Sequence, residues 1–587
     1  MAAWGLLLVF VALCALPWSE ALHFTPDAAN DTLRSVYDYI IVGGGTAGLT
    51  IANRLSENSS VSVLVLEAGP LDDARNLTIP KGLLPVPGVI GNGGWSEYEW
   101  GLITEPQTYL NDQYMEIPQG KAIGGSSILN GLCWTRGPAS DYDGWEKLGN
   151  KGWSWNAMLP YFKKAYFYGQ SANVLEGFSE LGIPIIDDPN SGTAAGAMLL
   201  PSSMHPTNQT RSDAREAHFS SANHRSNLHV ATGQTVTRLI LEPFNRFTGS
   251  RRVAGVEFAE NEKAKKRTVV CKREVIVSAG AIFSPTLLQV SGIGPAKILE
   301  SLDIPVEIDL PGIGYNLQDH PMIYATYYYR NSSLFKSDAI IGEVHDQVSR
   351  MYINNRTGVS VCILYREDFV DDKSSEEAVP DDAPPSVKIG YEAQKQILRE
   401  QALSNDMGIF ETMANSWGQL TVAAQKTFSR GTVRPSTPSI FDPPLLDPRY
   451  CSDPIDCEII VLGLQLNMKL IETRAMKELM PQPYTAFNTT DHDKLMREVL
   501  RGLTTERHPS GTVAMMPRDM GGVVDPELRV YGTCNLRVAD ASIMPLIPSA
   551  HLQAVVYAIA EKAADMIKET TPNCPHGPFP PKPRPTE

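Results

Sequence analysis

The stretch ERHPSGTVAMM, residues 506 to 516, contains a histidine in a setting that suits acid–base chemistry. His508 precedes a proline, which disfavours helical backbone angles at the preceding residue, and Gly511 can adopt angles that other residues avoid. The segment is therefore expected to be fixed and non-helical. A neutral imidazole held there could take a proton from a substrate hydroxyl. Because a lone histidine is more often structural than catalytic, the rest of the chain has to decide.

A glycine run near the N-terminus also has chemical meaning. Gly43-x-Gly45-x-x-Gly48 has the spacing of a dinucleotide-binding fingerprint, and an acidic residue, Glu67, follows about 20 residues later. The first glycine permits a tight turn, the second lets a pyrophosphate approach the backbone, and the third lets a helix pack on a strand. The Glu67 carboxylate can accept hydrogen bonds from an adenosine ribose. The motif alone does not separate NAD from FAD.

The elements that hold this motif follow from the hydrophobic pattern. Tyr37 to Val42 and Val61 to Leu66 are short β-branched runs, which predict buried strands, and Leu49 to Leu55 has helical spacing. Together they predict a βαβ unit. Further along, RVAGVEF and CKREVIVSAGA predict strands, SPTLLQVSGIG predicts the start and stop of a helix, and residues 551 to 569 predict another helix.

The length and charge of the chain limit its class. With 587 residues, 43% of them hydrophobic, more than one domain is expected. The formal net charge of -15 argues against nucleic acid and anionic membranes as partners, and a neutral or cationic small ligand fits better. From about residue 330 to 500 the glycine motifs stop and proline and charge increase, which predicts a different domain. The proline-rich tail, residues 571–587, is expected to be extended or disordered.

The N-terminus predicts secretion. An apolar run of about 13 residues precedes Pro17 and a Ser19-x-Ala21 pair, which indicates a signal peptide, residues 1–21. The run is shorter than the roughly 18 to 20 residues that span a bilayer, and no later stretch predicts a transmembrane helix. A secreted enzyme cannot rely on diffusible nicotinamide, which favours a tightly held FAD. Glycosylation sequons are consistent with secretion and occur at Asn30, Asn58, Asn76, Asn208, Asn331, Asn355 and Asn488.

The eight cysteines suggest at most a local disulfide. Loss of Cys14 with the signal peptide leaves an odd number. The pair in CSDPIDC, Cys451 and Cys457, is expected to be either a disulfide or two buried thiols, with equal weight. No cysteine has metal-ligand spacing to another cysteine or to a histidine, so no metal site is predicted. Apolar surroundings predict buried thiols at Cys133, Cys271, Cys362 and Cys534.

Four longer blocks resemble one known family. These blocks are GKAIGGSSILNGLCWTRG (120–137), GAIFSPTLLQVSGIG (280–294), LPGIGYNLQDHP (310–321) and the stretch HPSGTVAMMPRDMGGVVDPELRVYGTCNLRVADASIMP. With the glycine fingerprint, they resemble the glucose-methanol-choline (GMC) flavoprotein oxidoreductases over about residues 36 to 568. The pattern looks like a secreted fungal-type member, similar to aryl-alcohol oxidases and FAD-dependent glucose dehydrogenases.

The resemblance implies an α/β fold with two domains. A Rossmann-like FAD-binding domain would comprise residues 36–135, 225–320 and 505–570. A second, α+β substrate-binding domain, built on an antiparallel sheet, would comprise residues 136–224 and 321–504.

The resemblance also implies the cofactor site. Residues Asn130 to Cys133 would lie along the flavin ring, the Val236 backbone near the adenine, Asp540 and Ala541 under the ribityl chain and pyrophosphate, and Gln553 near the pyrimidine edge. The first signature block contains no histidine that could carry the flavin, so non-covalent FAD is expected. The implied cofactor-binding residues are Gly43, Gly45, Thr46, Ala47, Gly48, Glu67, Ala68, Gly125, Ser126, Asn130, Gly131, Leu132, Cys133, Val236, Asp540, Ala541 and Gln553.

His508 gains a partner through the resemblance, because His551 occupies the second position of the family's catalytic pair. We expect His508 to be the base and His551 the second hydrogen-bond donor, although two coupled imidazoles leave that assignment open. His224, His229 and His320 are expected to be structural.

The implied function is oxidation of a CH–OH group in a small alcohol, a lactol, a sugar or a secondary metabolite, with dioxygen or a quinone-type compound as electron acceptor. A lyase or cyclase that uses the histidine pair without redox chemistry is the alternative, and a non-catalytic binding protein is a third reading. The aromatic segments 93–100 and 324–330 could line a pocket or belong to the core. Oligomeric state stays open.

Overall fold

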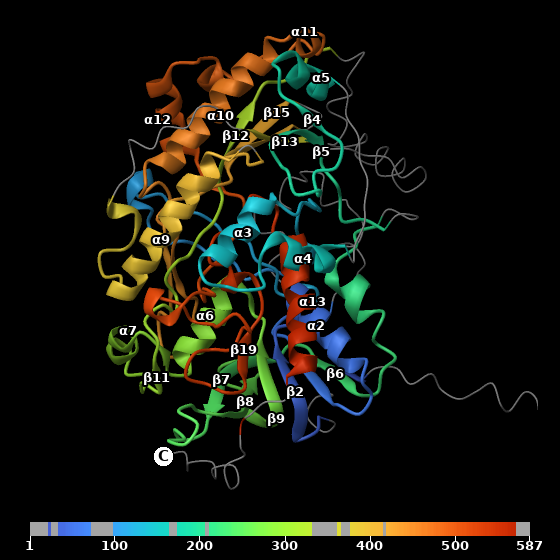
Figure 1. The fold of residues 1–587 in the computed structure, drawn as a ribbon, viewed down its shortest axis with the longest axis vertical. Helices are drawn as coiled ribbons and strands as arrows, with labels where there is room; N and C mark the ends of the chain where they lie inside the picture. The colour runs from blue at the N-terminus through green and yellow to red at the C-terminus, as the bar shows by residue number, and fades with distance from the viewer. Residues whose placement is uncertain are drawn as a thin grey trace, which may run out of the picture.

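The computed structural model describes residues 22–24, 33–71, 98–163, 173–205, 210–331, 361–365, 376–404, 406–414, 418–570 and 574. Within these ranges the chain forms two large sheets, which occupy the lower and upper halves of the molecule in Figure 1. The predicted signal peptide and almost all of the proline-rich tail lie outside the described residues.

The lower sheet has eight strands in the order β1-β6-β3-β2-β9-β8-β7, with β19 also paired to β9. Five neighbouring pairs are parallel, whereas β8 pairs antiparallel with both β9 and β7. This is the predicted Rossmann-like sheet. Its strands are β1 Leu22–Phe24, β2 Val36–Val42, β3 Val63–Leu66, β6 Leu228–Ala231, β7 Thr235–Leu241, β8 Val253–Ala259, β9 Arg267–Val277 and β19 Leu536–Val538.

The predicted βαβ unit is β2, helix α2 (Thr46–Ser56) and β3. All four residues of β3 are buried, which explains its continuous apolar run, since central parallel strands are covered on both faces. Helix α13 (Gln553–Glu569) packs beside α2 (Figure 1). An ion pair joins the two helices, with 2.6 Å between Arg54 Nη2 and Glu561 Oε1. The predicted C-terminal helix is therefore part of the dinucleotide-binding half.

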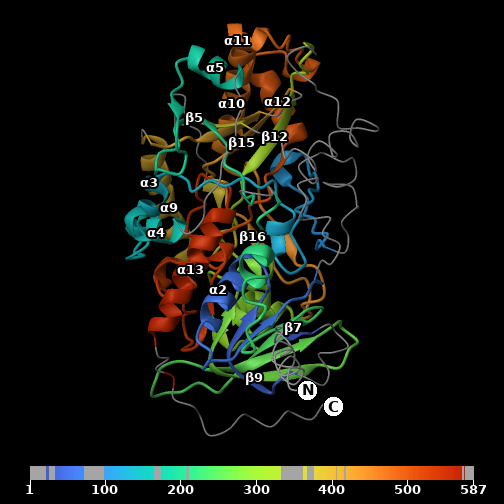
Figure 2. The same ribbon diagram turned by 90° about the vertical axis from the view of Figure 1, so that its right-hand side faces the viewer.

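The upper sheet has seven strands in the order β18-β12-β15-β14-β13-β5-β4 and is antiparallel except for the β4–β5 pair. This confirms the predicted antiparallel second sheet. Helix α10 (Ile455–Ile471) packs on it, as the side view in Figure 2 shows. The strands are β4 Ile185–Ile186, β5 Gly196–Leu199, β12 Pro321–Thr326, β13 Val361–Tyr365, β14 Phe410–Ala414, β15 Gln419–Ala424 and β18 Thr504–Thr505.

The predicted strands at 252–258 and 271–281 correspond to β8 and β9. The predicted helix at 284–294 corresponds to α6, which begins earlier, at Gly280, and ends at Val290. No helix in the described ranges is both long and apolar enough to cross a bilayer. The remaining α-helices are α3 Ala139–Lys147, α4 Trp155–Phe162, α5 Asn173–Glu180, α6 Gly280–Val290, α7 Ala296–Ser301, α9 Pro385–Ala402, α11 Arg474–Lys477 and α12 His492–Gly502.

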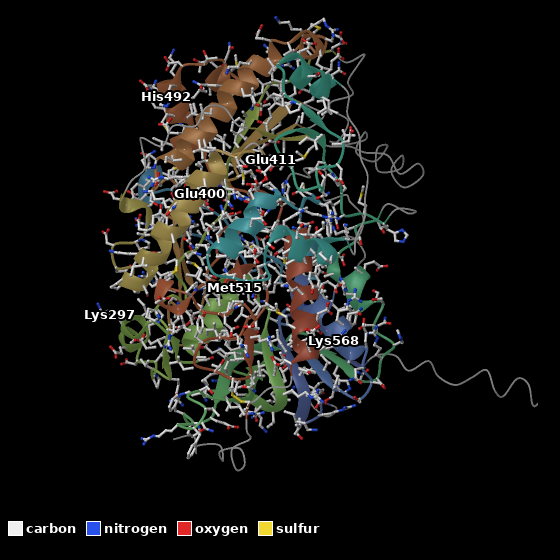
Figure 3. The ribbon with its side chains drawn as sticks, viewed as in Figure 1. Lys297, Glu400, Glu411, His492, Met515 and Lys568 are labelled. Carbon is white, nitrogen blue, oxygen red and sulfur yellow. A yellow bond between two sulfur atoms is a disulfide. The ribbon has the colours of Figure 1, made fainter. Side chains whose placement is uncertain are left out.

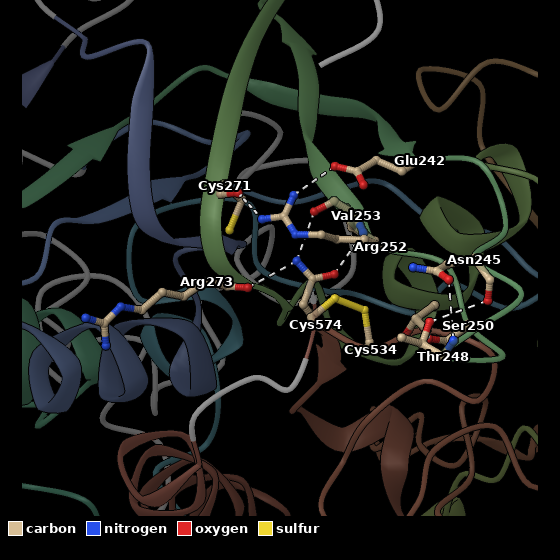
Figure 4. Close-up of a disulfide and its surroundings, with 12 residues drawn as sticks. Glu242, Asn245, Thr248, Ser250, Arg252, Val253, Cys271, Arg273, Cys534 and Cys574 are labelled. Carbon is tan, nitrogen blue, oxygen red and sulfur yellow. Dashed lines mark hydrogen bonds and ion pairs between the residues drawn. A yellow bond between two sulfur atoms is a disulfide. The ribbon is translucent and has the colours of Figure 1, made fainter. Parts of the chain in front are cut away.

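Two disulfides are present among the described residues. Cys451 and Cys457 are bonded, so of the two alternatives the disulfide is confirmed. The predicted thiol at Cys534 is wrong, because Cys534 is bonded to Cys574 (Figure 4). This bond links Cys574, beyond the end of α13, to the segment just before β19, a pairing that no local sequence pattern predicts. Cys271 is a buried thiol as predicted. Cys133 is also a free thiol as predicted, but its predicted burial is wrong because the residue is only half-buried. The Cys362 side chain lies outside the described part of the structure.

Candidate active site

A cavity of about 450 Å³ opens at the carboxyl ends of the parallel strands. Gly43 follows β2, Glu67 follows β3 and Asp540 follows β19, and all three line it. The upper sheet also contributes to the lining, through Tyr324 on β12 and Met413 on β14. Open α/β sheets bind ligands at this edge, where loops from several strands converge.

The fingerprint glycines have different roles. Gly43 has φ +101°, and a Cβ there would lie 2.5 Å from the Ser278 carbonyl oxygen; a Cβ on Gly48 would lie 1.9 Å from the Gly43 carbonyl oxygen. The protein's own packing therefore requires both glycines. A Cβ on Gly45 would meet only the Gly125 Cα, at an ordinary 3.7 Å. The space at Gly45 is left for a ligand that approaches the backbone from the cavity.

The N-terminus of helix α2 faces the same space. The helix starts at Thr46, and its N-cap, Gly45, makes no side-chain capping bond. Thr46 and Ala47 line the cavity, and the first turn carries no acidic residue. Free amide groups and the positive end of the helix dipole favour an anion here, such as a diphosphate.

Glu67 is suited to a ribose. Its carboxylate accepts hydrogen bonds from the Gly44 amide at 2.6 Å and the Gly69 amide at 2.8 Å, which fixes its position. Burial nevertheless raises the pKa of Glu67 to about 7. Each carboxylate oxygen can accept a further hydrogen bond, so ribose hydroxyls would satisfy it.

Most of the predicted cofactor residues lie together. Two do not line the cavity: Gly48 packs against Gly43, and Leu132 is fully buried. Asp540 borders the cavity, but its carboxylate bonds the Gly280 amide and the Ser284 hydroxyl and so holds the loop after β9. The predicted cofactor residues that line the cavity are Gly43, Gly45, Thr46, Ala47, Glu67, Ala68, Gly125, Ser126, Asn130, Gly131, Cys133, Val236, Asp540, Ala541 and Gln553.

Asn130 ties its loop to the start of α13. Its amide donates to Gln553 Oε1 at 2.9 Å, and its Oδ1 accepts from Arg211 Nη1 at 2.7 Å and from the Leu132 amide at 3.1 Å. Arg211 is buried, which lowers its pKa to about 10, and it also lines the cavity. Sequence reasoning missed Arg211, which carries no motif.

His508 and His551 meet at one wall of this cavity, with ring centroids 5.2 Å apart and planes at 80°. His508 follows β18, and its amide donates to Asp319 Oδ1 at 2.7 Å. His551 precedes α13, and its amide donates to Thr135 Oγ1 at 2.9 Å. Backbone bonds to separate elements thus bring the predicted catalytic pair together.

Two glutamates that sequence reasoning missed contact the pair through buried side chains: Glu506 also borders the cavity, whereas Glu411 does not line it. Glu411 Oε1, on β14, lies 3.1 Å from His551 Nε2, and Figure 3 shows Glu411 at the level of the upper sheet. Glu506 Oε2 lies 3.4 Å from His508 Nδ1. Gln425 Nε2 donates to both carboxylates, at 2.9 and 3.0 Å. The only sequence signal was the position of Glu506 two residues before His508.

His320, predicted to be structural, is fully buried behind His508. Its Nδ1 lies 3.0 Å from His508 Nδ1 and 3.2 Å from Glu506 Oε2. It does not line the cavity, so it reaches any ligand only through His508 or Glu506, which do.

The two catalytic candidates have opposite protonation tendencies. Burial lowers the pKa of His508, and the neighbouring Glu506 only partly offsets it. Burial alone would lower the pKa of His551 as well, but Cys133, Glu411 and Glu506 outweigh it and raise that pKa well above its usual value. His508 therefore favours the neutral, basic form and His551 the protonated, donating form.

The same side chains have donor types that metal ions use. Most of their nitrogen and oxygen atoms contact one another or Gln425 at 2.9 to 3.4 Å, as in a hydrogen-bonded network, and no metal ligand is assigned. The absence of a metal site stays a prediction. The two sets of donors are His320, Glu506 and His508, and Glu411, Glu506 and His551.

A dinucleotide cradle and an imidazole pair on one cavity define a dinucleotide-dependent oxidoreductase. Two family models described as GMC oxidoreductase match residues 37–322 and 427–560. The chain belongs to the GMC oxidoreductase family and is an enzyme that acts on CH–OH donors. The resemblance inferred from the sequence blocks is confirmed for the family and for its fungal-type members; the similarity to FAD-dependent glucose dehydrogenases stays a prediction.

Relatives match nearly the whole chain. Dehydrogenase xptC from Emericella nidulans is 33% identical, covering 93% of this chain and 95% of its own. An oxygen-dependent choline dehydrogenase from Pseudomonas fluorescens is 32% identical, covering 91% and 94%. Among solved structures, an FAD-dependent oxidoreductase from Chaetomium thermophilum aligns with a TM-score of 0.83 at 31% identity, covering 91% and 99%. A fungal aryl-alcohol oxidase aligns with a TM-score of 0.79 at 28% identity, covering 91% and 99%.

FAD is the cofactor typical of this family, and the described residues fit it. The open space at Gly45 and the uncapped start of α2 suit the pyrophosphate, while Glu67 suits the ribose. The loop from Asn130 to Cys133 borders the cavity near His551, where a flavin ring would have to lie for hydride transfer.

Proposed function

We propose that this protein is a secreted oxidoreductase with non-covalent FAD that oxidises a CH–OH group of a small alcohol, lactol or sugar. The observation that carries the proposal is that His508 and His551 face the same cavity as the dinucleotide cradle. The N-terminal apolar run supports secretion, as do the sequon residues Asn58 and Asn488, which are exposed.

In the proposed reaction His508 is the base. Its Nδ1 faces His320 and Glu506, which leaves Nε2 for the cavity and for the substrate hydroxyl proton. His551, held protonated by the acidic groups around it, donates a hydrogen bond to the same oxygen and stabilises negative charge there. Bound FAD would supply the hydride acceptor.

The names of the relatives support an alcohol as substrate, because one acts on choline and another on aryl alcohols. Aromatic side chains line part of the cavity, namely Trp100, Phe283 and Tyr324. From the same aromatic segments, Tyr327 and Tyr329 are buried in the core. Among the described residues, these segments therefore contribute both to the cavity lining and to the core. The aromatic lining supports a substrate with an apolar or aromatic portion.

An anaerobic absorbance titration tests the proposal. The purified holoenzyme is mixed with aryl alcohols, amino alcohols, lactols and aldoses in turn, and air is then admitted. Bleaching of the flavin band by one class supports the redox function, and the speed of recovery in air separates an oxidase from a dehydrogenase. Turnover of a substrate without any bleaching would favour the lyase or cyclase alternative. Extraction of intact FAD by acid would support non-covalent binding.

A further inference from the structure

The Glu506 carboxylate lies close to four polar side chains of the catalytic cluster at once. Its Oε2 lies 3.0 Å from Gln425 Nε2, 3.2 Å from His320 Nδ1 and 3.4 Å from His508 Nδ1. Its Oε1 lies 3.8 Å from His551 Nδ1 and has no hydrogen-bond partner among the described residues. The side chain is 5% exposed, so little water screens its charge.

The hydrogen positions around Glu506 are restricted. His320 and His508 face each other through Nδ1 atoms 3.0 Å apart, so only one of them can carry a proton between the rings. Once His508 Nε2 holds a substrate proton, the ring is an imidazolium and its Nδ1 must also carry hydrogen. Glu506 Oε2 and a His320 nitrogen are then the two acceptors within reach, and only Glu506 brings a negative charge.

We propose that Glu506 is a positioning residue that retains the abstracted proton in the active site by stabilising the His508 imidazolium. This inference rests on the proposed function. In the step, the substrate O–H bond breaks and an N–H bond forms at His508 Nε2. The C–H bond breaks with its two electrons leaving as hydride, and a C=O bond forms; FAD, when bound, would supply the acceptor for that hydride. Reduction of the enzyme by an alcohol then releases no proton to solvent.

The charges around Glu506 show why its loss would matter. The groups facing it are His320 before β12, Gln425 after β15, His508 after β18 and His551 before α13, and Glu411 approaches from β14. Asp319 binds the His508 backbone amide. Without the Glu506 charge, an imidazolium at His508 would face two other imidazoles, one of them protonated. Burial keeps the resting pKa of His508 low, but a cofactor that has accepted hydride would add negative charge to the same cavity and raise that pKa. Glu506 adds to this effect, since an opposite charge at this range shifts a pKa by about 1 to 3 units, so neutralising Glu506 should expel the proton.

Proton release during reduction tests this directly. The holoenzyme, weakly buffered at pH 7 with a pH-indicator dye, is reduced anaerobically by the alcohol that bleaches it, and released protons are counted per flavin. We expect close to none for the wild type and for Glu506→Asp, and close to one for Glu506→Gln. Glu411→Gln is the matched control, because it also removes a buried carboxylate bonded by Gln425 but one that faces His551. It should release close to none.

Several results would overturn the inference. Release of one proton per flavin by the wild type would by itself overturn the inference, even if Glu506→Gln yields no holoenzyme. Equal release by Glu506→Gln and Glu411→Gln would show a general charge effect, and no release by Glu506→Gln would show that the carboxylate is not needed. A second readout is the acid limb of kcat/KM, which should move about 1 pH unit lower in Glu506→Gln. Failure of the wild-type flavin to bleach would instead reject the proposed function itself.

Discussion

His508 and His551 lie edge to face with ring centroids 5.2 Å apart, and each is backed by a different buried carboxylate. Glu506 stands 3.4 Å from His508, and Glu411 stands 3.1 Å from His551. The arrangement gives two adjacent imidazoles unequal surroundings, because His551 is close to both carboxylates whereas His508 is close to one. Unequal surroundings allow one ring to accept a proton while the other donates a hydrogen bond.

Replacing His508 by alanine should lower the rate constant for flavin reduction by roughly 10² to 10⁴-fold, which is the usual contribution of a general base. His551→Ala should lower it too, since a donor to the developing negative charge is lost. Stopped-flow absorbance of the holoenzyme with saturating alcohol measures both. The exposed His224 lies outside the cavity, so His224→Ala serves as the control and should reduce at the wild-type rate. Wild-type reduction by His508→Ala would remove His508 from the mechanism.

Two alanine substitutions in the glycine fingerprint should separate cofactor binding from folding. Gly45→Ala places a methyl group in the space facing the cavity, so the FAD dissociation constant should rise about tenfold or more, while the apoprotein melting temperature falls only slightly because alanine is a poorer N-cap than glycine. Gly48→Ala places the methyl group 1.9 Å from a backbone oxygen, which should destabilise the apoprotein by about 1 to 3 kcal/mol. FAD titration by fluorescence quenching and thermal melts test the pair. Equal loss of stability in both variants would contradict this division.

The parts of the fold that could be predicted are those determined by interactions between residues close together in the sequence. The β2–α2–β3 unit follows from apolar runs and from glycines whose sterics act within a few residues, such as Gly43 and Gly48. The helix at α13 follows from its periodicity. The Cys534–Cys574 disulfide could not be predicted in this way, because 40 residues separate the two cysteines and no local pattern pairs them.

The site was predictable only in its motif-bearing parts. His508 and His551 lie in signature blocks, whereas Glu411 lies on a strand 140 residues from its partner His551 and has no spacing that marks it. A buried glutamate becomes recognisable only when the tertiary structure shows what neutralises it. The sequence shows Glu506 two residues before His508, but the role inferred for it also depends on its contact with His320, which comes from a different element.

Removing the long-range disulfide should destabilise the protein more than removing the local one. In the loop-closure view a cross-link contributes more when it closes a longer loop, and the separations here are 40 residues for Cys534–Cys574 and 6 for Cys451–Cys457. Cys574→Ser should therefore cost about 2 to 4 kcal/mol in unfolding free energy. Urea unfolding of both single-serine variants measures the difference. A larger loss from Cys457→Ser would show that local packing outweighs loop closure.

Glu67 should make apoprotein stability depend on pH. Its pKa is about 7 in the folded chain, above the ordinary value of 4.5, because burial disfavours the charged form. Its contribution is therefore complete below pH 4.5 and is lost as the pH rises through 7, up to about 3 kcal/mol by pH 8. Glu67→Gln cannot ionise, so its apoprotein should gain stability relative to the wild type between pH 5 and pH 8, while its FAD affinity falls.

Urea unfolding of the two apoproteins at pH 5 and pH 8 measures the gain. Other buried carboxyls with raised pKa values, such as Asp456 and Asp540, titrate in both proteins, so only the difference between them reports on Glu67. An equal difference at both pH values would mean that Glu67 titrates in the folded apoprotein as it does in water. The loss of FAD affinity has a separate cause, since an amide replaces an acceptor that the ribose hydroxyls need.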